Sequence, residues 1–564
     1  MTNKQGQNRQ NQARRESKGK RTESGRQGQN GESRQMRRSG GIGQKSNNER
    51  TGAATNGGGR GRNGAGSASS RRNREGNSSQ AQIEGLPVTK NDEVAIDIIG
   101  MNHDGEGVGR AEGYTLFVQG ALPGEKVRVK VLKTKKQYGY AKLLDVLTPS
   151  PDRVATPCPI YDQCGGCQLQ HWSYAGQLAW KRQHVIDALE RIGKLHVAGE
   201  LQAGSGAAEA AAHGAVDAEA GPGINVLPTL GMAEPWRYRN KAQVPVGVTD
   251  GALVGGFYAR GSHRIVDMET CLIQHEHNDD VVSHVKAIAR DLGVTAYDEE
   301  TGRGLLRHVV VKKAFRTGEM MLVLVTNGRD IPHADAWIGL IREQIPQVVS
   351  ICQNVNTKQT NVIFGDETRV LWGRDVIYDY IGEVQFAISA RSFYQVNPVQ
   401  TEVLYNKTVE YAGLTGKETV IDAYCGIGTI SLFLAQHADQ VYGVEIVKEA
   451  IEDARSNAEL NGMTNVKFEV GASEDVIPRW KQEGIEADVI VVDPPRKGCD
   501  PRLLETILEM KPERVVYVSC NPSTLVRDLR ILEDGGYRTV EVQSVDMFPH
   551  TVHVECCSLL VRKD

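Results

Sequence analysis

The sequence predicts a multi-domain protein with a small OB-like β-barrel, a mixed α+β central domain that carries a cysteine-rich loop, and a C-terminal Rossmann-like α/β domain. Three observations support this prediction. Short strand-like runs separated by glycine turns occupy residues 88–148, three cysteines follow within a short loop, and strands alternate with helices from about residue 386 onward. A chain of 564 residues is long enough for three or four such domains.

The N-terminal segment, residues 1–85, is rich in Gly, Asn, Gln, Ser and Arg and holds few large apolar side chains. Such a composition cannot bury enough surface to offset the entropy of ordering, so we predict a disordered basic tail. Residues 1–80 hold 18 Lys and Arg and 5 acidic residues, whereas the whole chain has a net charge of −3. This asymmetry is typical of a basic arm that contacts nucleic acid, although the tail could also serve solubility alone.

The next segment, residues 86–149, reads as five short strands that form a small β-barrel. Residues 126–131, KVRVKV, alternate strictly, so that basic side chains share one face and valines share the other. Further lysines follow, with Tyr138 and Tyr140 interleaved. This combination favours a nucleic-acid-binding surface, and an ordinary solvated strand face is the alternative.

The predicted central domain, residues 150–385, begins with a cluster of cysteines. Cys158, Cys164 and Cys167 lie within CPIYDQCGGCQLQH, where two glycines let the chain curl tightly. Cys271 is the nearest further cysteine and could supply a fourth thiolate. Four thiolates suit either zinc or an iron–sulfur cluster, and the spacing alone does not choose between them.

Other parts of the sequence concern a predicted insertion and the cellular location of the protein. Residues 200–224 are rich in Ala and Gly, and we predict a flexible insertion without chemistry. No apolar run approaches the ~18 residues that a membrane span needs, and the N-terminus lacks the apolar core of a signal peptide. We therefore expect a cytoplasmic protein without a membrane partner, whose ten cysteines are thiols, metal ligands or catalytic groups.

The C-terminal domain, residues 386–564, contains a strand, a glycine turn and a helix over residues 420–435, VIDAYCGIGTISLFLA. Glu445 ends the next predicted strand, where an acid can accept hydrogen bonds from ribose hydroxyls. The turn lacks the full GxGxxG pattern of dinucleotide enzymes, which favours S-adenosylmethionine over NAD. Open α/β sheets bind ligands at the carboxyl ends of their strands. We expect four residues to converge there: Tyr424, Glu445, Asp493 and Cys520.

Several motifs together resemble those of a known family. The motifs are CGGC with a distant fourth cysteine, SFYQVN, DAYCGIGT, DPPRKG, SCNP and DMFPHTVHVE. In combination they resemble the RNA uracil-5-methyltransferases, and the basic barrel resembles a TRAM domain. The resemblance covers about residues 86–564 apart from the insertion at 200–224. It is to the branch with both a TRAM domain and a [4Fe–4S] cluster, whose bacterial members mostly act on 23S ribosomal RNA; bacterial relatives that modify tRNA typically lack both features.

The resemblance implies a class I methyltransferase fold for the C-terminal domain and a role for each motif residue. It implies that four cysteines bind a [4Fe–4S] cluster: Cys158, Cys164, Cys167 and Cys271. It implies that four residues bind S-adenosylmethionine: Gln395, Tyr424, Glu445 and Asp493. Cys520 would be the nucleophile and Glu555 the base. The chain departs from some relatives at Thr429, where the family turn can carry Asn, and at His553-Val554-Glu555, where others have HLE.

The chemistry of uracil methylation explains why such a site needs a thiol. Carbon 5 of uracil is too weak a nucleophile to take a methyl group from a sulfonium. A thiolate that adds to carbon 6 makes carbon 5 enolate-like, and a base must afterwards remove the proton on carbon 5. Together with the resemblance, this chemistry implies that Cys520 adds covalently to a target uridine, expected in 23S ribosomal RNA, which must leave its stack to reach the site.

Alternative functions are open at this point. The chain could be a tRNA uracil-5-methyltransferase, or it could methylate an exocyclic amine, which needs no thiol. Cytosine-5 methylation is chemically closer, but those enzymes usually place Pro before the nucleophilic Cys, whereas Ser519 precedes Cys520. A non-catalytic RNA-binding ribosome assembly factor would explain the tail and the barrel, but not the thiol beside a methyl-donor site. We expect the protein to act as a monomer.

Overall fold

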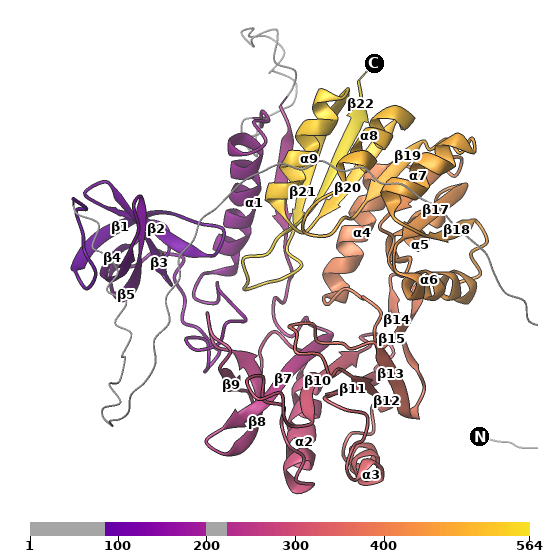
Figure 1. Ribbon diagram of the computed structural model, residues 1–564. Coiled ribbons are helices and arrows are strands. Elements are labelled where there is room, and N and C mark those ends of the chain that lie inside the picture. Colours follow the sequence, from indigo (N-terminus) through magenta and orange to yellow (C-terminus); the bar gives the residue numbers. More distant parts are fainter. Residues whose placement is uncertain (1–84, 199–222, 564) are drawn as a thin grey trace, which may run out of the picture. The chain divides into compact units, whose positions relative to one another are not determined.

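The computed structural model describes residues 85–198 and 223–563, which belong to one compact unit (Figure 1). The predicted basic tail and nearly all of the predicted insertion at 200–224 lie outside these residues. In the described ranges, no helix is both long enough and apolar enough to cross a membrane.

The first part of the described chain is a closed five-stranded barrel, which confirms the predicted β-barrel. Its strands follow the order β1-β2-β3-β5-β4 around the barrel. They are β1 (Glu93–Met101), β2 (Glu106–Ala111), β3 (Tyr114–Gln119), β4 (Lys126–Thr134) and β5 (Tyr138–Thr148). The alternation in β4 has the predicted effect, because Val127, Val129 and Val131 are fully buried and Lys126 and Arg128 are exposed. Because side chains alternate along the strand, the valines fill the barrel interior and the basic side chains stay on its outer surface.

The central part contains a seven-stranded sheet with the order β13-β12-β11-β10-β7-β8-β9. Its strands are β7 (Lys241–Thr249), β8 (Ala252–Tyr258), β9 (Ile265–Asp267), β10 (Leu306–Lys313), β11 (Met320–Thr326), β12 (Val348–Val355) and β13 (Glu367–Gly373). Helices α2 (Glu276–Asp291) and α3 (Ala334–Gln344) pack against this sheet through residues such as Val285 and Trp337. A separate hairpin, β14 (Val376–Ile381) and β15 (Val384–Ser389), leads into the C-terminal part.

The C-terminal part is an eight-stranded sheet with the order β18-β17-β16-β19-β20-β22-β21-β6 (Figure 1). Its strands are β6 (Asn225–Leu230), β16 (Thr419–Ala423), β17 (Gln440–Glu445), β18 (Val466–Val470), β19 (Val489–Val492), β20 (Arg514–Ser519), β21 (Tyr537–Val545) and β22 (Glu555–Arg562). Strands β16 to β20 are parallel, as the alternation of strands and helices predicted, and β22 runs antiparallel to β20 and β21.

Helices cover both faces of this sheet. The helices are α1 (Tyr174–Arg191), α4 (Pro398–Ala412), α5 (Thr429–Ala435), α6 (Lys448–Leu460), α7 (Ser473–Gln482), α8 (Pro501–Met510) and α9 (Pro522–Asp534). Successive strand residues enter different cores: Val489 and Val491 pack with α4, α5 and α6, whereas Ile490 and Val492 pack with α1, α7, α8 and α9. The continuous apolar strands therefore reflect burial on both faces, as expected for a parallel sheet.

The edge of the sheet comes from an unexpected part of the chain. Strand β6 lies in the range that the sequence assigned to the central domain, yet it pairs in parallel with β21. Helix α1 packs beside it, and Arg182 Nε donates to Val226 O at 3.0 Å. A local pattern cannot reveal this pairing, because the two strands are separated by about 300 residues.

Candidate active site

A cavity of about 720 Å³ lies at the carboxyl ends of the parallel strands. All six residues that the sequence predicted for methyl-donor binding or catalysis line it: Gln395, Tyr424, Glu445, Asp493, Cys520 and Glu555. Tyr424, Asp493 and Cys520 directly follow β16, β19 and β20, and Glu445 is the last residue of β17. The parallel sheet brings these residues together because it ends all four strands at the same edge.

Glu555 reaches this edge by a different route. It is the first residue of β22, and β22 runs antiparallel to β20. Ser519, the last residue of β20, pairs with Cys556, so Glu555 and Cys520 lie next to each other at the end of the two strands. The thiol and the carboxyl thus meet in one cavity although distant segments supply them.

The turn after β16 lies beside the cavity and has a left-handed backbone at three positions. Tyr424 has a φ of +66°, and Gly426 and Gly428 have φ values of +55° and +81°. At Gly428 a Cβ atom would lie 2.9 Å from the ring of Phe468, so only glycine fits there without displacing a neighbour. The left-handed conformation of Tyr424, a residue with a side chain, marks local backbone strain of the kind that collects at functional sites.

The thiol of Cys520 lies in an environment that favours its protonated form. Burial, together with the nearby carboxyl groups of Glu555 and Asp493, raises the pKa of Cys520 to about 11, against the opposing effects of the Arg496 charge and of a backbone hydrogen bond. Burial raises the pKa of Asp493 to about 7. Burial and the proximity of Asp493 also raise the pKa of Glu555 well above its usual range. The site therefore stabilises neutral groups, and a positively charged ligand would favour their ionised forms.

The local sequence around Cys520 fixes the thiol at the strand tip. Strand β20 ends at Ser519, and α9 begins at Pro522, which stands in the first helical turn. The side chain of Asn521 caps the helix by accepting a hydrogen bond from Ser523 N at 3.0 Å. Its amide nitrogen donates to Arg496 O at 3.2 Å, which ties the turn to the loop after Asp493.

The four cysteines predicted to be metal ligands line a second cavity, of about 410 Å³. They are Cys158, Cys164, Cys167 and Cys271. Burial and the neighbouring thiols raise the pKa of Cys167 to about 11, and burial with the Cys167 thiol raises that of Cys271 to about 12. Over residues 85–198 and 223–563, no group of three or more His, Cys, Asp or Glu side chains is arranged as a metal site. As a donor set, four thiols around one cavity nevertheless fit either zinc or an iron–sulfur cluster.

Two arginines hold the cysteine segments in place through backbone carbonyl groups. Arg260 donates to Cys164 O at 3.1 Å and to Cys167 O at 2.6 Å. Arg237 donates to Cys271 O at 2.9 Å and to the carboxylate of Asp279 at 2.7 Å, and Asp279 in turn accepts from Cys271 N. These bonds fix the loops from which the thiols project.

Three residues line both cavities and were not among the predicted catalytic, cofactor-binding or metal-binding residues: Arg496, Phe548 and His553. They belong to the DPPRKG and DMFPHTVHVE motifs. The motifs locate these residues in the sequence. Only the fold shows that their side chains lie between the thiol of Cys520 and the cysteine-lined cavity. The cavity at the strand ends, called the cleft below, and the cysteine cavity are therefore neighbours. These three residues form the wall that they share.

Comparison with known proteins agrees with this architecture. The model of the tRNA (uracil-5-)-methyltransferase family matches residues 366–563, and that of the TRAM domain matches residues 87–144. The first range covers all strands of the C-terminal sheet except β6, and the second covers the closed barrel apart from the end of β5.

Two relatives and one solved structure extend the comparison. An uncharacterized RNA methyltransferase of Halalkalibacterium halodurans is 58% identical over 478 residues, which cover 85% of this chain and 99% of that protein. One of Listeria monocytogenes is 52% identical over 478 residues, with coverages of 85% and 99%. The tRNA (uracil-54, C5)-methyltransferase of Pyrococcus abyssi, solved with S-adenosyl-L-homocysteine, has 26% identity and a TM-score of 0.63, and covers 83% of this chain and 100% of that one. This chain belongs to the RNA uracil-5-methyltransferase family.

Proposed function

We propose that the protein transfers a methyl group from S-adenosylmethionine to carbon 5 of a uridine in 23S ribosomal RNA, through a covalent bond between Cys520 and carbon 6. The observation that carries this proposal is the meeting of the Cys520 thiol and the Glu555 carboxyl in the cavity at the strand ends. An enzyme that methylates an exocyclic amine has no use for such a pair.

S-adenosylmethionine would bind along the strand ends. Glu445 stands where a carboxylate can accept hydrogen bonds from the ribose hydroxyls, and the adjacent Ile446 is 69% exposed, so it offers an apolar surface for the adenine. Gln395, Tyr424 and Asp493 complete the set of proposed contacts. The Pyrococcus abyssi neighbour, whose structure holds the demethylated product of this cofactor, supports the assignment.

The electrostatics of the site suit a reaction that begins only with ligands bound. In the ligand-free cavity the thiol of Cys520 is protonated at neutral pH, because its pKa is raised to about 11. The positive sulfonium of S-adenosylmethionine, acting with Arg496, would lower that pKa and favour the nucleophilic thiolate. We therefore expect kcat/KM for 5-methyluridine formation to rise as the pH increases above neutrality. Reactions without RNA supply the background to be subtracted.

Glu555 would complete the reaction. After methyl transfer, carbon 5 carries both the new methyl group and a proton. Glu555 would take this proton, the C–H electrons would restore the double bond between carbons 5 and 6, and the sulfur of Cys520 would leave as thiolate. A carboxylate with a raised pKa is a stronger base once it is ionised, which suits this step.

The cysteine cavity would hold a [4Fe–4S] cluster on Cys158, Cys164, Cys167 and Cys271. The four-thiol donor set supports the proposal, and we assign the cluster a structural role in placing RNA, without a part in the methylation steps. Anaerobic purification followed by absorption spectroscopy and analysis of iron and acid-labile sulfide tests it. Zinc without iron would contradict the cluster.

The identity of the RNA substrate is the most specific part of the proposal. The joint presence of the barrel and of the cysteine cavity supports 23S ribosomal RNA, whereas the name of the matching family and that of the Pyrococcus abyssi neighbour favour tRNA as the second candidate. Mass spectrometry of nucleosides from unmodified 23S rRNA and tRNA, each incubated with the protein and S-adenosylmethionine, separates the two. 5-Methyluridine in tRNA alone would overturn the ribosomal assignment, and no methylated nucleoside in either would favour the non-catalytic assembly factor.

The remaining assignments follow from this function. We propose a cytoplasmic monomer whose barrel, residues 86–149, binds RNA, followed by a central domain over residues 150–385 and a methyltransferase domain over residues 386–564. Strand β6 is the part of the central range that completes the sheet of the methyltransferase domain.

A further inference from the structure

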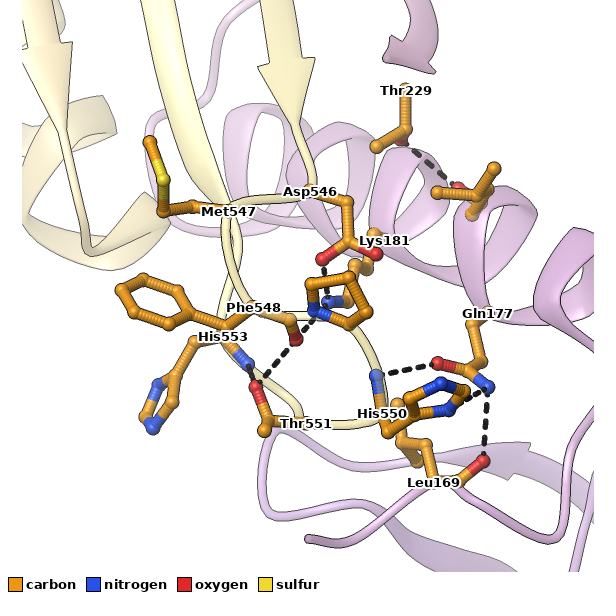
Figure 2. A network of polar contacts seen from close by, with 12 residues as sticks. Leu169, Gln177, Lys181, Thr229, Asp546, Met547, Phe548, His550, Thr551 and His553 are labelled. Carbon is orange, nitrogen blue, oxygen red and sulfur yellow. Dashed lines mark hydrogen bonds and ion pairs between the residues drawn. The ribbon is translucent and has the colours of Figure 1, made fainter. Parts of the chain in front are cut away.

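The connection between β21 and β22, residues 546–554, links the two cavities. It precedes Glu555 directly and carries Phe548 and His553, which line both the cleft and the cysteine cavity. The pairing of β22 with β20 places Glu555 at the strand end, and the shape of the connection sets how the chain enters β22 at this residue. Its contacts come mostly from outside the methyltransferase strands (Figure 2).

Helix α1 holds the start of the connection through a buried ion pair. Lys181 Nζ donates to Asp546 Oδ1 at 2.5 Å and to Phe548 O at 3.1 Å. Neither side chain of the Lys181–Asp546 pair is exposed to solvent. Figure 2 shows both side chains pointing toward each other across the interface between helix and connection. A buried pair of this kind fixes geometry, because moving either partner leaves a charge without compensation.

One turn earlier on α1, Gln177 holds the middle of the connection. Its Oε1 accepts a hydrogen bond from His550 N at 3.0 Å, and its Nε2 donates to Leu169 O at 3.1 Å and to Trp172 O at 2.9 Å. Gln177 is fully buried. One amide therefore ties the connection to the segment that follows the cysteine loop.

His550 itself is held in an unusual conformation. Its φ is +66°, its ring stacks on Trp236 with a centroid distance of 3.6 Å, and burial lowers its pKa to about 3. Its carbonyl oxygen accepts from Gln168 N and Leu169 N, each at 3.0 Å. A residue other than glycine adopts this backbone only where its surroundings impose it, so the contacts around His550 determine the shape of the connection.

We propose that Gln177 and Lys181 are positioning residues for RNA methylation. They hold residues 546–554 in the shape that keeps Glu555 beside Cys520 and keeps Phe548 and His553 in the wall between the two cavities. This inference rests on the proposed role of Glu555. When the connection relaxes, the base is displaced from carbon 5, so proton removal slows while thiolate addition and methyl transfer continue.

The test measures which step slows. Gln177→Leu, Glu555→Gln and the unchanged protein are mixed with RNA and S-adenosylmethionine in single-turnover reactions. The covalent protein–RNA adduct is followed on denaturing gels, and 5-methyluridine is followed by mass spectrometry. Gln177→Leu is expected to release product about 10²-fold more slowly and to accumulate the adduct, with unchanged affinity for S-adenosylmethionine. Gln183→Leu, at an exposed site on the same helix, is the matched control and is expected to behave like the unchanged protein.

Two further variants keep the test decisive. Gln177→Glu retains an acceptor for His550 N and is expected to restore part of the release rate. If Gln177→Leu does not fold, the double variant Lys181→Met with Asp546→Leu removes the pair without leaving a buried charge, and it is expected to accumulate adduct.

Each outcome decides something. Adduct accumulation by both Gln177→Leu and Glu555→Gln supports the inference. Normal release by folded Gln177→Leu, while Glu555→Gln accumulates adduct, overturns the positioning role and leaves the proposed function intact. Normal release by Glu555→Gln overturns the assignment of the base, and with it the inference.

Discussion

The methyl-transfer cleft and the cysteine cavity share a wall but are built by different means. The cleft takes Tyr424, Asp493 and Cys520 from the ends of parallel strands, so the sheet itself fixes their spacing. The cysteine cavity is formed by loops, which Arg237 and Arg260 hold through hydrogen bonds to backbone carbonyls. A regular sheet thus sets the spacing of these three residues, whereas the cysteine cavity depends on individual side chains. Changes at Cys520 and at the four clustered cysteines, outside the shared wall, should therefore affect the two cavities separately.

The largest expected effect breaks the cleft alone. Cys520→Ala removes the proposed nucleophile, so formation of 5-methyluridine should fall by about 10⁴-fold or more, because the proposed mechanism requires the thiolate. Titration calorimetry should show unchanged binding of S-adenosylmethionine, and the iron content should stay the same. Cys352→Ala, a buried cysteine in β12, is the control that should keep activity. Full activity of Cys520→Ala would support methylation of an exocyclic amine.

The reciprocal change breaks the cysteine cavity. Cys164→Ser removes one of four thiols, so the iron of the proposed cluster should be almost completely lost, while the affinity for S-adenosylmethionine should stay unchanged because the sheet is intact. Iron analysis and calorimetry measure the two quantities on one sample. Methylation should fall less than in Cys520→Ala. Equal iron content in Cys164→Ser and the unchanged protein would exclude this thiol as a ligand.

A third prediction concerns the effect of the buried Asp493 in the cleft on the pH dependence of stability. Asp493 has a folded-state pKa of about 7, above the 3.8 of an unperturbed carboxyl. Between these values the folded state holds a proton that the unfolded state releases, so this group lowers stability as pH rises from about 4 to about 7, by up to about 4 kcal/mol. Above pH 7 its contribution is constant.

Asp493→Asn removes this dependence. Denaturant unfolding at pH 5 and pH 8 should show a smaller loss of stability with pH in the variant than in the unchanged protein, although methylation is impaired. Burial and the nearby Asp493 carboxyl raise the pKa of Asp422 to about 7, so the loss of the Asp493 charge also lowers the pKa of Asp422 and adds to the expected decrease in pH dependence. Identical pH dependence in the two proteins would show that Asp493 is ionised in the folded state throughout this range.

The smallest expected effect lies in the barrel, outside both cavities. Tyr138 packs against Phe117 and Tyr140 with ring centroids 5.4 and 5.8 Å away, and Lys135 lies 5.0 Å from its centroid. Tyr138→Ala should weaken RNA binding by about 1–3 kcal/mol, the usual contribution of a base stacked on an aromatic ring. The rate at saturating RNA should stay unchanged. Fluorescence anisotropy gives the affinity, and a loss of rate without a loss of affinity would contradict an RNA-binding role.

The sequence predicted the parts of the molecule that depend on local pattern. Alternation gave the barrel strands, and the carboxyl ends of parallel strands brought Tyr424, Glu445 and Asp493 together, because that convergence is a property of the topology rather than of any single contact. The sequence did not reveal that β6 joins the C-terminal sheet, because its pairing with β21 is non-local. The sequence also did not predict that the two cavities share a wall. A motif such as DMFPHTVHVE contains no information on where the side chains of Phe548 and His553 lie in space. The cluster and the individual catalytic roles stay predictions.

The pairing of β6 with β21 has a consequence for biosynthesis. The ribosome releases residues 225–230 long before residues 537–545, so the nascent chain must keep β6 available until almost the whole protein has emerged. Contacts of such high sequence separation slow folding. A fragment that begins at residue 386 would present β21 as an open edge, which is prone to pair with other chains and aggregate. For expression, the smallest workable unit of the methyltransferase half therefore has to include α1 and β6.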